Sequence, residues 1–372
     1  MDLSAYEIDG LVPSRVERPS TTADVAAVIG AAHRAHEAVV LHGGGTRIGV
    51  GDAPTRYDTA VDLRGLRGIV EHSAPDLVCT VRAGTTLAEL ATALASQGQR
   101  WPVDVADPER ATVGGTIASA APSPSRLRYQ HPRDWVIGCE AVLGDGTVAR
   151  AGGRVVKNVT GYDLTRLYSG SFGSLAAITE VSLKLVAIDE TRCIYRLRGE
   201  ALAPLANTLR RMFPFEAIVL DRDGTIETLY VRAAGPRSSV ERAASVLQRH
   251  GTFEEFGAAE WDALCSRPVR SDVAARCSVP PGAEADLLPR ADQAYVGTGI
   301  AYTFGPRSRD ELARLRESCE QMGGALVLER APVDARRTVG TWGTHRTPGG
   351  VAAALKARFD PHGVLAPGRM PA

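Results

Sequence analysis

Lysine is the scarcest charged residue in this chain of 372 amino acids. Only three of the 43 basic residues are lysines, at positions 157, 184 and 356, and arginine supplies the others. Acidic residues also number 43, so the formal net charge is zero. A neutral chain lacks the electrostatic field that attracts nucleic acid or an anionic membrane surface. We therefore expect no nucleic-acid partner.

Cysteine is also sparse, with six residues scattered along the chain. None of them shows the CxxC spacing that is typical of zinc sites and iron–sulfur clusters. The sequence therefore predicts no metal site and no second redox centre in this chain. Cys139 falls within an apolar, strand-like run, where a free cysteine packs as a small hydrophobic residue.

Long apolar runs are absent too. No stretch reaches the ~18–20 uninterrupted apolar residues that a membrane-spanning helix needs. The first ten residues have neither the basic start nor the apolar centre of a signal peptide. We expect a cytoplasmic protein without direct membrane insertion, whose association with a membrane would be made through partner proteins.

Glycine is abundant, and three consecutive glycines occupy positions 43–45 after the apolar run Val39-Val40-Leu41. Glycine accepts positive φ and lets a ligand approach the backbone closely. Successive N–H groups in such a loop form a concavity that suits a phosphate or pyrophosphate. A tight turn between two strands is the alternative interpretation. The loop is neither a P-loop nor a GxGxxG motif, which argues against a Rossmann-type NAD domain.

Two further glycine-centred segments follow at residues 107–118 and 158–180, and residues 358–369 read RFDPHGVLAPGR. In this order and spacing, the segments resemble the FAD-binding PCMH-type domain of the vanillyl-alcohol oxidase flavoprotein superfamily. The closer resemblance is to the FAD-binding E subunit of bacterial glycolate oxidase. It is strong over roughly residues 10–190, weak over 190–340, and strong again near the C-terminus.

The expected fold is α+β. The resemblance implies a PCMH-type FAD-binding domain of two α+β subdomains over residues 1–190. A smaller α/β sandwich cap domain, which would contact the substrate, is expected over residues 191–340. Residues 341–372 would then return to the flavin domain.

Periodicity and capping residues predict the individual elements. Capping boxes at Thr21 and Thr86 open two helices in the first half. Strands are expected there at 38–41, 60–63, 78–82, 136–143 and 176–186.

In the second half, strands are expected at 193–197, 217–221, 226–232, 294–304 and 325–329. Helices are expected near 201–212, 238–250 and 308–321, the last two with capping boxes at Ser238 and Ser308. They should cover one face of a sheet. Residues 251–292 are expected to be irregular.

The resemblance implies FAD as the cofactor, and we expect it to be bound non-covalently. Some members of the superfamily attach the flavin to a histidine just after the glycines, whereas here His42 precedes them and Arg47 follows. Cys139 is an alternative attachment point, but a buried strand cysteine is the simpler interpretation. The predicted cofactor-binding residues are His42, Gly43, Gly44, Gly45, Thr46, Arg47, Ile48, Gly49, Thr112, Gly114, Gly115, Ala118, Tyr162, Gly170, Ser171, Gly173 and Ile178.

Oxidation of a 2-hydroxy acid needs a cation for the carboxylate, a base near the hydroxyl carbon and a flavin to receive the hydride. The sequence does not identify catalytic residues, and each candidate alone has a surface or packing role as its alternative. Tyr129, His131, His345 and Arg369 are the candidates for catalysis. The wider set that could contact substrate adds Arg126, Arg128, Arg133, Trp342 and Arg346.

Several positions depart from the family pattern. The metal-binding HxGDGN-like motif of related D-lactate dehydrogenases and of the glycolate oxidase D subunit is absent. Phe172 stands where relatives often have glutamate, and Ala176 and Ala366 replace a usual glycine and asparagine. Residues 121–124, APSP, replace a usual Gly-Pro step. These departures bear on catalysis more than on FAD binding.

The functional hypothesis is an FAD-dependent oxidoreductase, similar to the FAD-binding subunit of glycolate oxidase, that oxidises a small 2-hydroxy acid (glycolate to glyoxylate). Its expected partners are a homologous flavoprotein subunit and an iron–sulfur subunit, which would take the electrons onward. One alternative is a non-catalytic accessory subunit that binds FAD or conducts electrons. Another is a stand-alone sugar or alcohol oxidase of the same fold.

Overall fold

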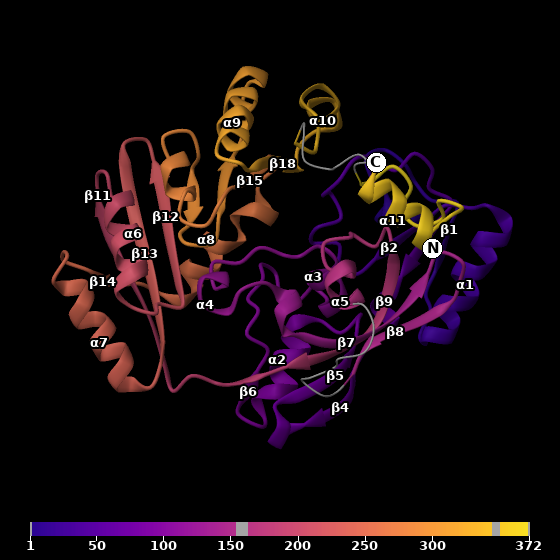
Figure 1. Cartoon of the computed structure of the whole chain (residues 1–372), viewed down its shortest axis with the longest axis horizontal. Coiled ribbons are helices and arrows are strands. Elements are labelled where there is room, and N and C mark those ends of the chain that lie inside the picture. The colour runs from indigo at the N-terminus through magenta and orange to yellow at the C-terminus, as the bar shows by residue number, and fades with distance from the viewer. Residues whose placement is uncertain (1, 154–162, 344–349, 371–372) are drawn as a thin grey trace.

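The structure, a computed structural model, describes residues 2–153, 163–343 and 350–370. Figure 1 shows one large sheet on one side of the molecule and smaller sheets on the other. The large sheet has eight strands, two of the smaller sheets have three and five, and a short pairing of Gln99–Arg100 with Val186–Ala187 forms a further sheet of two strands. The smaller sheets come from the first half of the chain, and the large sheet comes from residues 191–330. Helices and strands are mixed in both parts, so the predicted α+β class is confirmed.

The sheets of three and five strands differ in strand direction. One is parallel, with the order β1-β3-β2. Its strands are Arg15–Glu17, Thr59–Asp62 and Val39–His42. The other is antiparallel, with the order β4-β5-β9-β7-β8. In that order its strands are Ile69–Ser73, Val78–Arg82, Ala176–Lys184, Val136–Leu143 and Val148–Gly152.

Both helices predicted from capping boxes in the first half are present. Helix α1 (Thr22–Ala35) begins where Thr21 accepts the Asp24 N–H, and α2 (Leu87–Ala95) begins in the same way at Thr86. In each box the carboxylate of the acidic residue accepts a hydrogen bond from the N–H of the cap residue. The reciprocal pair of bonds satisfies N–H groups that a helix end otherwise leaves unpaired.

The eight-stranded sheet is antiparallel throughout and has the order β14-β11-β13-β12-β16-β17-β15-β18. Its strands in that order are Glu254–Glu255, Thr191–Gly199, Ile226–Gly235, Ala217–Asp223, Gln293–Tyr295, Ile300–Phe304, Ala274–Ser278 and Ala325–Arg330. Side chains alternate between its faces: Ile218 and Leu220 join one core, and Ala217 and Val219 join another. Both faces of this sheet are therefore buried.

Helices cover both faces, which corrects the expectation of helices on one face only. Helices α6 (Ala203–Met212), α7 (Arg237–Gln248) and α9 (Arg309–Gln321) pack on the core that contains Ile218. Helix α8 (Ala258–Arg270) covers the opposite face with Trp261 and Leu264.

The prediction of an irregular segment at 251–292 was also wrong. It contains β14, α8 and β15, and a 3-10 turn at Glu284–Leu287. Pro268 reads as a helix breaker in the sequence, but it lies in the last turn of α8. Burial of Trp261 outweighs its cost, because packing of an apolar face supplies most of a helix's stability.

Two smaller expectations also fail. The Ser238 capping box does not form, because β13 runs to Gly235 and α7 starts at Arg237 directly after Pro236. The strand expected at 294–304 is two strands, since Gly297 and Gly299 take positive φ and turn the chain between them. The Ser308 box at the start of α9 is present as predicted.

The shorter elements connect these layers. They are β6 (Gln99–Arg100), α3 (Val113–Ala118), α4 (Arg126–Tyr129), α5 (Leu164–Tyr168), β10 (Val186–Ala187), α10 (Val333–Val339) and α11 (Val351–Phe359). After α11 the chain lies beside β2, where the Val39 N–H donates to the Val364 carbonyl at 2.7 Å and the Ala366 N–H donates to Val39 at 2.7 Å. The C-terminal segment thus extends the parallel sheet, and Leu365 is fully buried there.

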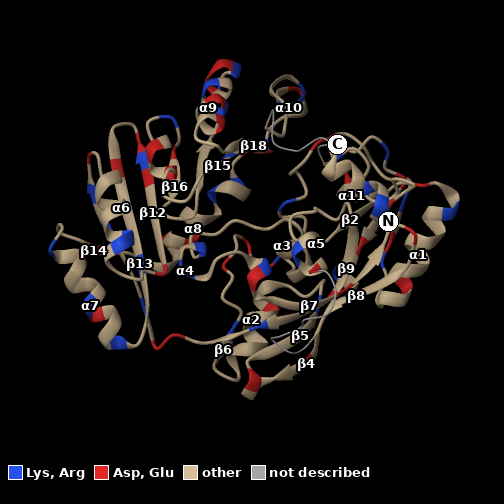
Figure 2. Cartoon of the chain, viewed as in Figure 1, with Lys and Arg blue, Asp and Glu red and all other residues tan. Residues whose placement is uncertain are grey.

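Buried charges join the first half of the chain to the large sheet. Glu216, which has no exposed surface, forms ion pairs with Arg100 at 3.3 Å, Arg192 at 3.0 Å and Arg232 at 2.9 Å. Arg232 also pairs with Asp104. Elsewhere acidic and basic residues mix along the exposed helices, as on α9 (Figure 2). The ion pairs around Glu216 hold the two parts of the chain together, because removing one member would leave a buried charge without its partner.

Candidate functional site

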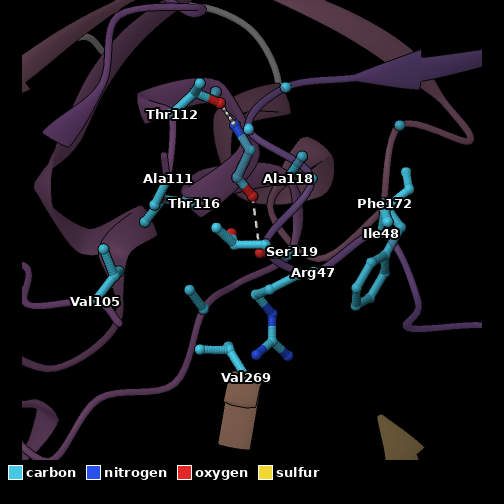
Figure 3. Close-up of a pocket in the computed structure, with 18 of the residues that line it drawn as sticks. Arg47, Ile48, Val105, Ala111, Thr112, Thr116, Ala118, Ser119, Phe172 and Val269 are labelled. Carbon is cyan, nitrogen blue, oxygen red and sulfur yellow. Dashed lines mark hydrogen bonds between the residues drawn. The ribbon is translucent and has the colours of Figure 1, made fainter. Parts of the chain in front are cut away.

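A cavity lies where the first half of the chain meets the large sheet (Figure 3). The space between its walls, with the adjoining open solvent, amounts to about 1170 Å³. Residues 43–48 and the segment 111–119 form its walls on one side. Cys265, Val269 and Tyr302, from α8 and β17, form walls on the other.

The glycine loop presents unpaired backbone donors to this cavity. Within the described part of the chain, the N–H groups of Gly44, Gly45, Thr46 and Arg47 donate to no acceptor. Gly45 takes the positive φ (72°) that was expected of the loop. Four consecutive free amides form the kind of concavity that binds phosphate oxygens.

Glycine is required at position 44 because of a close steric contact and not because of a positive φ. Its φ is ordinary, but a Cβ placed on it would lie 1.6 Å from the Arg110 carbonyl oxygen. The Arg110 guanidinium in turn donates to the Gly44 carbonyl at 3.2 Å. The loop therefore rests directly on the second glycine segment, and this contact orients its backbone.

The second glycine segment keeps its own amides occupied. The Gly114 N–H donates to the Ala83 carbonyl at 2.8 Å, and the Gly115 N–H donates to the Thr112 hydroxyl at 3.3 Å. A Cβ on Gly114 would lie 2.7 Å from the Ala83 Cβ. Helix α3 thus supplies shape to the cavity wall, and its glycines allow close packing on β5.

The other end of the cavity is apolar and aromatic. Tyr295 and Tyr302 reach it from the large sheet, and Val269 reaches it from α8. Phe172, held at positive φ (51°), also lines it and meets Trp342 edge-on at 5.9 Å between ring centres. A flat, mostly apolar group fits such walls.

Arg47 lines this end and shares a buried carboxylate with Arg276. The Arg47 guanidinium points across the cavity toward Val269 (Figure 3), and its Nη2 donates to Glu329 at 2.7 Å. Arg276 donates to the same carboxylate at 2.6 Å, and the Tyr302 hydroxyl donates at 3.3 Å. Burial alone would raise the pKa of Glu329, but the charges of Arg47 and Arg276 outweigh it and lower that pKa to about 2.

Most of the predicted cofactor-binding residues meet at this cavity. Those that line it are Gly43, Gly44, Gly45, Thr46, Arg47, Ile48, Thr112, Gly114, Gly115, Ala118, Gly173 and Ile178. They come from three segments that lie far apart in the sequence. The Arg47 guanidinium is turned to Glu329 on β18.

Four predicted residues do not line the cavity. The His42 ring hydrogen bonds the Tyr57 hydroxyl at 2.6 Å, and burial lowers the pKa of His42 to about 4. Gly49 lies beyond the loop, and Gly170 and Ser171 bond to neighbouring backbone carbonyls. Tyr162 lies outside the described residues.

The candidates for catalysis do not all lie at the cavity. Tyr129 lies in the boundary between the two parts, where its hydroxyl accepts a bond from Arg100 at 2.9 Å, and does not reach the cavity. His131 contacts the Arg126 guanidinium and does not line the cavity either. Arg369 does line it and donates to the Val50 carbonyl at 2.6 Å. His345 and Arg346 lie outside the described residues.

Sequence reasoning missed the walls that the second half provides. Cys265, Pro268, Val269, Tyr295 and Tyr302 all line the cavity. No motif marks them, because α8 and the strands β16 and β17 reach the cavity only through tertiary packing. A cation–π contact of Arg232 over Trp261, at 4.8 Å, ties α8 to the buried charge network.

Neither the Cys139 thiol nor the Cys265 thiol is activated. Burial raises the pKa of Cys139 to about 12, and that residue lies in β7 away from the cavity. Cys265 lines the cavity, and burial raises its pKa as well. The thiol form is a weak nucleophile.

No group of three or more potential metal ligands occurs among residues 2–153, 163–343 and 350–370. Within the same ranges, no helix is both long and apolar enough to cross a bilayer.

The donor set and shape fit FAD. The free amides of residues 44–47 suit its pyrophosphate, and the wall of Phe172, Tyr295, Tyr302 and Val269 suits its ring system. The amide loop and the aromatic wall belong to one continuous cavity.

Comparison with known proteins supports this fit. A family described as an FAD binding domain matches residues 13–152. The glycolate oxidase subunit GlcD of Bacillus subtilis (strain 168) is 26% identical over 421 residues, covering 96% of this chain and 89% of that protein. The glycolate oxidase subunit GlcE of Escherichia coli (strain K12) is 35% identical over 193 residues, covering 50% of this chain and 53% of that protein.

A D-lactate dehydrogenase of Archaeoglobus fulgidus is 35% identical over 170 residues, covering 46% of this chain and 38% of that protein. The chain thus spans about half or less of the length of these last two relatives. Among solved structures, an alkyldihydroxyacetonephosphate synthase matches with a TM-score of 0.69 at 14% identity, covering 96% of this chain and 77% of that one. That likeness shows the fold alone.

These matches confirm the resemblance seen in the glycine segments and identify FAD as the cofactor. Residues 13–152 match the FAD binding domain family, and the chain is similar to FAD-linked oxidoreductases that include glycolate oxidase subunits and a D-lactate dehydrogenase.

Proposed function

We propose that this chain oxidises a small 2-hydroxy acid, with glycolate to glyoxylate as the reference reaction, and that the electrons leave through a partner subunit. The observation that carries the proposal is the cavity itself. The free backbone amides of residues 44–47 lie at one end of it. The other end is apolar and is bounded by the side chain of Arg47. When bound, FAD supplies the hydride acceptor.

The chain's own residues would do three things. The amides of the glycine loop would hold the pyrophosphate, and the α3 wall would fix the cavity's width. Tyr295, Tyr302 and Val269 would exclude water from the ring end, which strengthens electrostatic interactions there. The arginines at that end would supply the positive charge that a carboxylate substrate needs.

We propose that FAD is held without a covalent bond. The glycine loop carries no histidine after its glycines, and burial keeps the thiols of Cys139 and Cys265 protonated. Acid precipitation of the purified yellow protein should therefore release the flavin into the supernatant. Flavin that stays in the precipitate would contradict this.

The oxidation is tested by anaerobic mixing of the FAD-loaded chain with glycolate or D-lactate while the flavin absorbance is followed. We expect slow bleaching by the chain alone and faster bleaching after a homologous flavoprotein and an iron–sulfur subunit are added. No bleaching by either acid, with or without those subunits, would refute the proposal. A Gly44→Ala protein, expected to lack FAD, serves as the blank.

A second candidate function is a non-catalytic, FAD-binding accessory subunit. The observation that favours it is that no described residue lining the cavity is a histidine, aspartate or glutamate. Burial raises the pKa of Tyr295 and Tyr302, so neither hydroxyl is a base at neutral pH. Bleaching that occurs only in the presence of the homologous flavoprotein would support this function, and complete bleaching of the chain alone would exclude it.

A further inference from the structure

Two buried arginines hold the four consecutive carbonyl groups of residues 48–51. Arg369 donates through Nη2 to the carbonyls of residues 48 and 50, the latter at 2.6 Å. Arg336 donates through Nη1 to the carbonyls of residues 49 and 51, at 3.3 Å and 2.7 Å. The two guanidinium groups thus take alternate carbonyls in the segment that directly follows the free amides of residues 44–47.

Arg336 reaches this segment from the other part of the chain. It lies on α10, after the last strand of the large sheet (Figure 1), and is 6% exposed. Its Nη2 forms an ion pair with the Asp9 carboxylate. A guanidinium that has lost its hydration needs acceptors in the protein. Those of Arg336 are Asp9 and the two carbonyls, all of which belong to the first half of the chain.

The strand before α10 contacts the same stretch. Glu329, on β18, accepts a hydrogen bond from the Arg47 guanidinium at 2.7 Å. A Cβ placed on Gly49 would lie 3.8 Å from the Glu329 carbonyl oxygen. The end of the second half therefore holds residues 47–51 through a side chain at Arg47 and through the backbone at Gly49 and Gly51.

Peptide geometry links the held carbonyls to the free amides. The carbonyl of one residue and the N–H of the next lie in one plane and point in opposite directions. Holding the carbonyls of residues 48–51 therefore fixes the peptide units that follow the amides of residues 44–47. A peptide unit that rotated there would turn its carbonyl oxygen toward the cavity, and that oxygen would repel a phosphate.

We propose that Arg336 is a positioning residue for the phosphate-binding loop, because its bonds to the Gly49 and Gly51 carbonyls keep the amides of residues 44–47 directed at the pyrophosphate of FAD. This rests on the proposed function, in which those amides hold the pyrophosphate. It adds that the cofactor site is incomplete until α10 has docked on the loop.

Arg336→Met tests the proposal, because it removes the donors and keeps a side chain of similar length. The full-length chain, freed of FAD, is titrated with FAD by calorimetry, and the FAD-saturated protein is then studied by phosphorus NMR. We expect the dissociation constant of FAD to rise at least about tenfold and the resonances of the bound pyrophosphate to shift. Arg336→Lys should recover part of the affinity, because an ammonium group replaces the planar fork of donors by a point charge.

Arg337→Met is the matched control. Arg337 is the next residue of α10, but it is exposed and takes no part in the bonds to residues 48–51. Its replacement should leave both the FAD affinity and the phosphorus resonances at their wild-type values. A loss of the same size in Arg337→Met would assign the effect to the helix as a whole and overturn the proposal.

The phosphorus spectrum separates positioning from stability. Unchanged resonances in FAD-saturated Arg336→Met, with a lower thermal midpoint, would make Arg336 a stabilising residue only and overturn the inference. If Arg336→Met does not fold, the same two measurements on Arg336→Lys decide, and wild-type values for both would overturn it. Failure of glycolate and D-lactate to bleach the flavin, with the expected shift in Arg336→Met, would count against the oxidation and leave the role of Arg336 standing.

Discussion

Two glycine segments meet at the cofactor cavity, and they contribute to it in opposite ways. In the loop at 43–47, four consecutive N–H groups are free of protein acceptors. In α3 (Val113–Ala118), the first N–H groups are all taken by Thr85, Ala83, Thr112 and the helix itself. Both contain adjacent glycines, and in the sequence they look alike.

The difference teaches that a glycine pair has two physical uses. In the loop, Gly44 lets one backbone lie on another and leaves the amides exposed to a ligand. In α3, Gly114 lets a helix pack closely on Ala83 and uses its amide inside the protein. We therefore propose that the loop binds the cofactor and that the helix supports the loop. Each prediction below tests one side of this comparison.

The largest effect is expected for Gly44→Ala. The new Cβ would lie 1.6 Å from the Arg110 carbonyl oxygen, so the loop or its support must move by more than an ångström. We expect the affinity for FAD to fall by about 1,000-fold or more, equivalent to about 4 kcal/mol. Flavin absorbance per protein after gel filtration measures the loss.

Gly153→Ala is the control for that change, because a Cβ there meets nothing within 4 Å and the φ is not positive. It should retain FAD like the wild type. Full occupancy in Gly44→Ala would show that the loop is only a turn.

A smaller effect comes from His42, the strand residue that leads into the loop. Burial lowers the pKa of His42 to about 4, below the value near 6.5 of an unfolded chain. Between those values the unfolded state takes up a proton that the folded state refuses, so stability falls as the pH falls. The loss amounts to about 3 kcal/mol across the window.

His42→Gln removes this group while keeping an amide beside the Tyr57 hydroxyl. Its denaturation free energy between pH 6.5 and 4 should decline about 3 kcal/mol less than that of the wild type. Parallel declines in the two proteins would mean that His42 is protonated in the folded state.

Gly114→Ala should mainly cost stability. Its Cβ would lie 2.7 Å from the Ala83 Cβ, and overpacking of this kind costs about 1–3 kcal/mol. We expect a lower thermal midpoint and a far smaller loss of FAD than in Gly44→Ala. The double variant with Ala83→Gly should recover part of the stability, and if it recovers none the contact is not the cause.

The smallest effect is expected for Thr112→Val, which removes the N-cap of α3. The lost bond to the Gly115 N–H, 3.3 Å long, should cost about 1 kcal/mol of stability. The affinity for FAD should stay within about twofold, because the hydroxyl is used by the helix. A tenfold loss would place the hydroxyl on the cofactor and erase the contrast between the two segments.

The sequence predicted the parts of the fold that depend on local signals. Capping boxes at Thr21, Thr86 and Ser308 mark true helix starts, because the same few residues form the whole interaction. The three glycines at 43–45 could be assigned to a ligand loop for the same reason. The resemblance of several segments to one family added what no single motif indicates, which is that stretches far apart in the sequence converge on one cavity.

Long-range contacts account for the parts that sequence reasoning missed. Pro268 ends a helix in local terms, yet α8 persists because Trp261 is buried against the large sheet. Tyr302 and Val269 carry no pattern that announces a cavity wall.

The C-terminal segment has a consequence for the order of synthesis and folding. Val364 and Ala366 bond to Val39 in a sheet that is otherwise made from the first 62 residues. The eight-stranded sheet is contiguous and can close once residue 330 has left the ribosome, whereas the parallel sheet must wait for residue 366. The parallel sheet precedes the large sheet in the chain but is finished after it, and the amide loop that follows β2 gains its full support only once residue 366 has been made.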